Sequence, residues 1–177
     1  MRVFTVGHST RSTEELIAIL RAAGVRVLVD VRRFPGSRRH PQFGREALAA
    51  ALGEAGITYR WVEALGGRRS RRAGSPHVAW ENAGFAGYAD HMDTAEFRDA
   101  AARELLSSTE PTAVMCAEAH PSQCHRRLIS DWLVAHRVEV VHLLDARGTV
   151  AHSLTPFARV VDGDRVVYDR GAQGTLL

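Results

Sequence analysis

The chain has 177 residues, 45% of them hydrophobic, and a formal net charge of +3 at pH 7. This composition predicts one folded domain over residues 1–177 and excludes a disordered chain. All 23 basic residues are arginines, so no lysine can form a Schiff base. No apolar run is long enough to cross a membrane, and the N-terminus lacks the pattern of a signal peptide. We therefore expect a cytoplasmic protein with no membrane partner, in which the two cysteines are not a structural disulfide framework.

Strands and helices alternate in the first part of the chain. Ser12, with Glu15 three residues later, has the pattern of a capping box at the start of a helix. Gly24 is a typical helix stop. The apolar run at 25–31 predicts a strand buried on both faces. The expected strands are 2–6, 25–31 and 57–62, and the expected helices are 12–24 and 45–56.

The second part continues the alternation after a long polar connection at 65–84. Expected helices lie at 85–92, 94–108 and 124–137, and expected strands at 112–118 and 138–144. The tail at 157–169 alternates apolar and polar residues around Asp162-Gly163, which predicts a β-hairpin.

This order of elements predicts an α/β fold, a three-layer sandwich with a mainly parallel sheet flanked by helices, plus the C-terminal β-hairpin. Ligands of such sheets bind beyond the carboxyl ends of the strands. The residues at those ends should therefore meet along one edge of the sheet. They are His8, Ser9, Asp30, Arg32, Arg33, Glu63, Gly66, Gly67, Cys116, Glu118 and His142.

The two cysteines stand at a strand end and a helix start, in the segment VMCAEAHPSQCHRR at 114–127. A thiol at a helix N-terminus has a stabilised thiolate, and Arg126 could add to that stabilisation. Alternatively, Cys116 is a small buried hydrophobe and Cys124 is incidental. A disulfide between them would need the loop to bring them close together.

A metal site is another interpretation of the same segment. Cys116, His120, Cys124 and His125 are ligand types that hold zinc or iron, and His8 could join them, although the spacing matches no Cys-x-x-Cys pair. The order strand, cysteine, loop, helix also resembles rhodanese-like sulfurtransferases and cysteine phosphatases. However, the arginine that a phosphatase needs six residues after its cysteine is absent, because Ser122 and Ser130 occupy those positions.

Two loops are rich in arginine. Residues 32–45 contain five arginines and residues 66–72 contain four. Such loops suit phosphates or a nucleic-acid backbone, but a solvated basic loop has the same composition. Four aromatic residues could stack on a base or belong to the core: Phe34, Phe43, Trp61 and Trp80. Three histidines are expected at the surface without a role: His91, His136 and His152.

Five segments resemble, in order, the motifs of bacterial and archaeal proteins classed as domain of unknown function family 488. They are TVGHST, LVDVRRFPGSRRHPQF, LGG, FAGYADHM and CAEAHPSQCHRRLI, within residues 3–145. The resemblance implies a compact α/β fold and brings no reaction with it. The motif residues are Gly7, His8, Ser9, Asp30, Arg32, Pro35, Ser37, Arg38, Pro41, Phe43, Gly66, Gly67, Tyr88, Cys116, Glu118, Cys124, His125 and Arg126. Because many of them coincide with the strand ends, they predict a binding or active site.

The favoured hypothesis is an enzyme acting on a small anionic or nucleotide-like substrate in a pocket at the carboxyl edge of the sheet. Its reaction class stays open, with cysteine-dependent transfer or hydrolysis as one option. In this hypothesis Cys116 is the nucleophile or a metal ligand, and Glu118, His8 and His125 move protons. Substrate-binding and orienting roles fall to Ser9, Asp30, Arg32, Ser37, Arg38, Tyr88 and Arg126. The alternatives are a repair-associated nucleic-acid-binding module and a Cys/His metal protein. The sequence predicts no oligomeric state.

Overall fold

A computed structural model describes residues 1–36 and 39–169. Ser37 and Arg38, two of the predicted anion-binding residues, lie outside these ranges. A six-stranded sheet with the order β3-β2-β4-β1-β5-β6 forms the centre of the molecule. Its strands are β1 (Arg2–Gly7), β2 (Val27–Asp30), β3 (Thr58–Trp61), β4 (Thr112–Cys116), β5 (Glu139–Leu143) and β6 (Thr149–Ala151). The first five are parallel and β6 is antiparallel to β5, which confirms the predicted α/β class.

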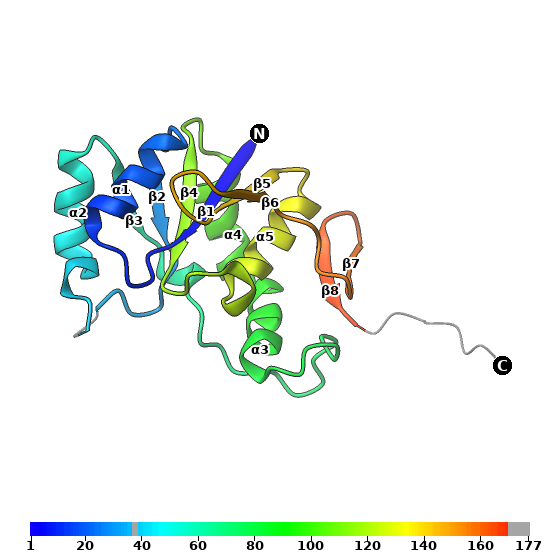
Figure 1. Ribbon diagram of the computed structural model, residues 1–177. Coiled ribbons are helices and arrows are strands. Elements are labelled where there is room, and N and C mark those ends of the chain that lie inside the picture. Colours follow the sequence, from blue (N-terminus) through cyan, green and yellow to red (C-terminus); the bar gives the residue numbers. More distant parts are fainter. Residues whose placement is uncertain (37–38, 170–177) are drawn as a thin grey trace.

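Helices cover both faces of the sheet (Figure 1). Successive strand residues point to opposite faces, so Leu28 joins one core while Val27 and Val29 join the other. The first core contains α1 (Thr13–Ala22) and α2 (Arg45–Glu54). The second contains α3 (Ala83–Met92), α4 (Ala95–Ala101) and α5 (Arg126–Ala135). A π-helical turn, η3 (Ala102–Leu106), continues α4. The described residues also include the 3₁₀ turns η1 (Pro41–Phe43), η2 (Glu63–Leu65) and η4 (Pro121–Gln123).

Local sequence signals account for the helix and hairpin ends. The capping box is present: the Glu15 amide donates to Ser12 Oγ at 3.1 Å, and the Ser12 amide donates to a Glu15 carboxylate oxygen at 2.7 Å. Gly24 follows α1 with φ +69°, a conformation that favours glycine. The tail hairpin, β7 (Ala158–Val161) and β8 (Arg165–Tyr168), turns at Asp162 and Gly163, both with positive φ. The predicted hairpin is therefore confirmed.

One strand was not predicted. The strand β6 has three residues, all of them exposed, so it lacks the apolar pattern that identifies a buried strand. The turn before it is set by Asp145, whose carboxylate accepts the amides of Arg147 and Gly148. Among the described helices, none has the length and apolar character needed to span a bilayer.

The strand order makes β1 and β4 neighbours although they are far apart in the sequence. The chain leaves β1 toward β2 but leaves β4 toward β5, so the direction of winding changes between these neighbours. Their pairing continues past the strand ends, where the His8 amide donates to the Cys116 carbonyl at 3.0 Å. A side chain at Gly7 would place its Cβ 1.8 Å from the Glu118 carbonyl oxygen, so this close approach requires glycine. The two segments that carry the site motifs are thus held side by side.

Candidate active site

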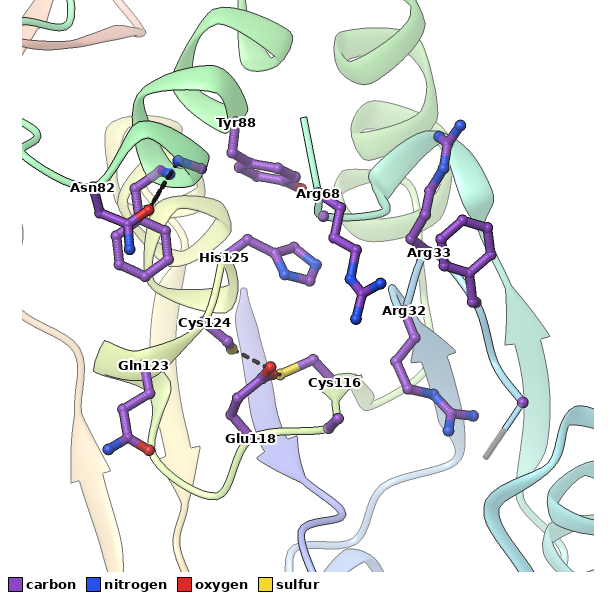
Figure 2. A pocket seen from close by; sticks show the side chains of 16 residues that line it. Arg32, Arg33, Arg68, Asn82, Tyr88, Cys116, Glu118, Gln123, Cys124 and His125 are labelled. Carbon is purple, nitrogen blue, oxygen red and sulfur yellow. Dashed lines mark hydrogen bonds between the residues drawn. The ribbon is translucent and has the colours of Figure 1, made fainter. Parts of the chain in front are cut away.

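A cavity of about 420 Å³ opens at the edge of the sheet where the parallel strands have their carboxyl ends. Its lining comes from the ends of β2 and β4, the glycine loop near residue 67, the start of α3 and the start of α5. Figure 2 shows three arginines gathered on one side: Arg32, Arg33 and Arg68. Asn82 and Gln123 lie on the other side, and both cysteines lie between the two groups. The cavity therefore has three arginine side chains on one wall, next to two cysteine thiols.

The two thiols are in contact but are not bonded. Cys116 Sγ and Cys124 Sγ are 2.7 Å apart, and both cysteines are free. Cys116 ends β4, and the η4 turn brings Cys124 back beside it. Only 1% of Cys116 and 4% of Cys124 is exposed, so the cavity is their route to solvent. The Glu118 carboxylate is 3.0 Å from Cys116 Sγ.

Arg126, the first residue of α5, lies fully buried against these sulfurs. Its Nε donates to Cys116 Sγ at 2.9 Å and to Cys124 Sγ at 3.2 Å. Its two Nη atoms donate to the Thr5 hydroxyl and to the backbone carbonyls of Glu118 and Ala119. Of these acceptors, only the sulfurs can be ionised. Because a buried guanidinium is costly without a negative partner, this geometry favours one thiolate shared by the pair.

The two cysteines differ in their acidity. Burial raises the pKa of the Cys116 thiol well above its ordinary value, and its hydrogen bond to Cys124 raises it further. Burial alone would also raise the pKa of Cys124. There, however, the hydrogen bond from Cys116 and the charge and hydrogen bonds of Arg126 outweigh burial and lower the pKa. These pKa directions, together with the additional hydrogen bond from the Arg126 amide to Cys124 Sγ, favour the thiolate on Cys124 and the proton on Cys116. The sequence predicted Cys116 as the nucleophile or a metal ligand.

His125 and Tyr88 form the wall of the cavity beside the thiols. His125 Nε2 donates to the Val31 carbonyl at 2.9 Å, and burial lowers the pKa of this histidine to about 4. The ring is therefore neutral at pH 7. A Cβ on Gly67 would lie 2.8 Å from His125 Nδ1, which explains the second glycine of the LGG motif. The Tyr88 ring packs at a tilt against the His125 ring, with the centroids 4.8 Å apart, and its hydroxyl donates to the Leu65 carbonyl. These contacts hold this wall of the cavity in place.

Asp30, Arg32 and His8 form a second cluster next to the cavity. Asp30 is fully buried and accepts hydrogen bonds from Arg32 Nε at 2.9 Å and from the Tyr59 hydroxyl at 2.6 Å. Arg32 Nη1 donates to His8 Nε2 at 3.3 Å, while the His8 ring stacks on Phe43. Burial lowers the pKa of His8 to about 4. Arg32 therefore lines the cavity with its charge balanced by Asp30. His8 contacts Arg32 but does not line the cavity.

The family comparison can now be set beside this geometry. The family model for the domain of unknown function DUF488 matches residues 12–133. The chain belongs to this family. No curated protein and no solved structure shows a significant match. The predicted resemblance is confirmed, although the matched segment is shorter than the expected 3–145 and leaves out the N-terminal motif TVGHST.

The matched DUF488 segment contains all residues that line the cavity, including both cysteines. Other predicted site residues in the described ranges lie outside this lining. The side chains of Asp30, His8 and Arg126 contact lining residues without lining the cavity themselves. Ser9 turns the chain after β1 with φ +49°, a strained conformation for a residue other than glycine. His120 is exposed, with Nδ1 2.7 Å from the Ser122 hydroxyl.

The metal-ligand set differs from the predicted one. Among the described residues, the group that could hold an ion is Cys116, Glu118 and Cys124, whose ligand atoms lie within 4.8 Å of one another. The predicted ligands His120 and His125 are not part of it. Arg126 already donates to both sulfurs, so a metal ion there would meet a positive charge and compete for the same lone pairs. The geometry therefore favours a thiolate site.

A chain of buried polar groups behind Arg126 was missed by the sequence analysis. The Thr5 hydroxyl, which accepts from Arg126, lies 2.7 Å from His142 Nδ1. His142 Nε2 is 2.9 Å from His152 Nδ1, and His152 Nε2 is 2.9 Å from an Asp131 carboxylate oxygen. Arg126 can only donate and the carboxylate can only accept, so every hydrogen bond points toward Asp131.

Two of the histidines expected at the surface are in fact enclosed. His152, in the polar chain, has a side chain that is 6% exposed. His91 is buried, with Nε2 2.7 Å from the Ala64 carbonyl. No pattern in the sequence marks either one, because their partners come from distant segments. His136 is half-buried and bonds to the Trp132 carbonyl.

Proposed function

We propose that this DUF488 protein is an enzyme that uses the Cys124 thiolate as a nucleophile on a small anionic substrate in the arginine-lined cavity. The observation that carries the proposal is the fully buried Arg126 guanidinium, which donates to both sulfurs. A thiolate is the reactive form of cysteine in group transfer and hydrolysis. The reaction class is therefore cysteine-dependent transfer or hydrolysis.

Each neighbouring group has a role in this proposal. Cys116 donates its S–H to the Cys124 thiolate and keeps it oriented. Glu118 is exposed at the cavity and 3.0 Å from Cys116 Sγ, so it can exchange a proton with the thiol pair. Arg68 binds the anionic part of the substrate, assisted by Arg33. The pair of Arg33 with the exposed Glu63 is 3.6 Å long, whereas Arg32 is neutralised by the buried Asp30.

Alkylation with reagents of different charge tests the proposal. Iodoacetamide and iodoacetate are applied to the wild-type protein and to Cys124→Ser at pH 7, and products are followed by intact mass. We expect one fast-reacting thiol, lost in Cys124→Ser. We also expect iodoacetate to react faster, relative to iodoacetamide, than it does with a free small thiol, because the cavity wall attracts anions.

Arg68→Gln is the charge variant, and Arg98→Gln, at a helical surface away from this cavity, is its control. We expect Arg68→Gln to lose several-fold of the iodoacetate preference and Arg98→Gln to keep it. Equal reactivity of both thiols, or a fast thiol that persists in Cys124→Ser, would reject Cys124 as the nucleophile. An unchanged preference in Arg68→Gln would reject the anion-binding role of that arginine.

A nucleic-acid ligand is the second candidate, favoured by the mouth of the same cavity. Phe34 is 65% exposed there, and the Arg68 guanidinium stands 5.9 Å from its ring centroid. An exposed aromatic ring beside an arginine suits stacking on an unpaired base. In the 68–72 run, Arg69 donates to the Gly66 carbonyl and Arg72 pairs with Asp90, so only part of the run is available. Binding of a single-stranded oligonucleotide that is lost in Phe34→Ala and falls steeply with salt would support this candidate.

A further inference from the structure

We propose that Cys116 and Cys124 are a redox pair that reduces a small anionic disulfide by thiol–disulfide exchange. This inference rests on the proposed Cys124 thiolate and goes further, because it names a substrate class and gives Cys116 a covalent step. The observation that carries it is the 2.7 Å contact between the two free sulfurs. The nucleophile and a second thiol are thus already in position to bond.

The local fold holds the pair without bonding it. Cys116 is fixed by its place in β4, whose backbone pairs with β1 and β2. Cys124 is fixed by the η4 turn and by the Arg126 amide, which donates to its sulfur at 3.4 Å. The sulfurs need to approach only to about 2.05 Å, the length of a disulfide. Formation of the bond therefore calls for a small movement of side chains.

The exchange proceeds in two balanced steps. The Cys124 thiolate attacks one sulfur of the substrate R–S–S–R′, the substrate bond breaks, and R′–S⁻ leaves. Glu118 then takes the proton of Cys116 and passes it to one of the released thiolates. The Cys116 thiolate attacks Cys124 in the mixed disulfide, which forms the Cys116–Cys124 bond and expels R–S⁻. Two electrons pass from the protein dithiol to the substrate disulfide.

The cavity selects the kind of disulfide. Both sulfurs are almost fully buried and are reached through a space of about 420 Å³, which suits a small molecule and excludes a folded protein. Arg33 and Arg68 at this cavity favour carboxylates on the substrate. Arg126 stabilises the thiolates formed in both steps, because its Nε donates to each sulfur.

The test uses oxidised glutathione as the anionic disulfide and cystamine as its cationic counterpart. The reduced wild-type protein should lose the mass of two hydrogens, and peptide mapping should join Cys116 to Cys124. Cys116→Ser should instead accumulate a glutathione adduct on Cys124. Cys124→Ser should stay unmodified. We expect cystamine to react at least several-fold more slowly than oxidised glutathione, relative to their rates with a free small thiol.

Several results would overturn the inference. They are a wild-type protein that stops at the glutathione adduct, adducts that form equally on both variants, or a cystamine rate that matches that of glutathione. Fast alkylation of Cys124 together with failed exchange would reject the redox pair and leave the proposed nucleophile standing. Failure of both experiments would reject both. The wild-type mass and mapping decide the question even if a serine variant does not fold.

Discussion

At the scale of single residues, Arg126 determines what the two cysteines can do. Its guanidinium is buried, and the groups that accept its hydrogen bonds are two sulfurs, one hydroxyl and two carbonyls. Removing it would leave two buried sulfurs without their cationic partner and beside the Glu118 carboxylate, where a thiolate is costly. The charge of Arg126 is thus the main difference between a reactive thiol and an inert one.

Arg126→Met should therefore raise the pKa of Cys124. Each unit of increase lowers the thiolate fraction near neutral pH about tenfold, so alkylation at pH 7 should slow by about tenfold or more. The measurement is the rate of iodoacetamide alkylation between pH 5 and pH 9. Arg127→Met is the matched control: the neighbouring arginine bonds to Thr155 and stacks over Trp80 without contacting the sulfurs. A pKa of Cys124 that is the same in both variants would contradict this role.

The sequence was enough to locate this site but not to assign its chemistry. Cys116, Glu118, Cys124 and His125 were predicted together because they belong to one strand, one loop and one helix start. Which sulfur carries the charge depends on hydrogen bonds at 2.7–3.2 Å, which no spacing rule encodes. His8 was placed in the site, but its ring is stacked on Phe43 behind Arg32. A strand-end position fixes the edge on which a residue lies and leaves open the direction of its side chain.

At the scale of elements, Asp131 on α5 holds the C-terminal segment to the core. Its carboxylate accepts hydrogen bonds from the Thr155 amide at 2.9 Å, the Thr155 hydroxyl at 2.7 Å and the Tyr168 hydroxyl at 2.8 Å. His152, the residue after β6, completes the set. One buried carboxylate on α5 thus binds both the segment that follows β6 and the strand β8. The sequence could not predict it, because its partners lie 21 to 37 residues away.

Asp131→Asn should lower the free energy of unfolding by about 2–3 kcal/mol, since a buried network of charged hydrogen bonds loses its charge. Asp99→Asn, on the exposed surface of α4, is the control and should change it by less than about 0.5 kcal/mol. Urea unfolding measures both. We also expect faster proteolysis within the β7–β8 hairpin in Asp131→Asn. Equal stability of the two variants would show that the segment is held by apolar contacts alone.

At the scale of the whole molecule, buried neutral histidines make stability depend on pH. Burial lowers the pKa of His8 and His125 to about 4 and that of His142 to about 3. In the unfolded chain each titrates near its ordinary value of about 6.5. Below that pH the unfolded chain binds protons that the folded protein does not, so acid favours unfolding.

The contribution of these histidines to the free energy of unfolding should therefore be constant above about pH 7 and fall as the pH drops from 6.5 to 4. His8 alone should contribute about 3 kcal/mol to this loss. Urea unfolding at a series of pH values measures the slope, which should be smaller in His8→Gln. The exposed His120 offers a control, because His120→Gln should keep the wild-type slope. A flat profile between pH 4 and pH 7 would show that these histidines become protonated without unfolding.

The position of β4 in the sheet has a consequence for how the newly synthesised chain folds. In the described sheet, β1 pairs with β4 and β5, and β2 pairs with β3 and β4. A nascent chain that has not yet exposed residues 112–116 can join β2 to β3, but its first strand has no neighbour. Such dependence on contacts distant in sequence slows folding. The strand that joins β1 to β2 ends in Cys116, so the thiol pair can form only after this strand has been synthesised.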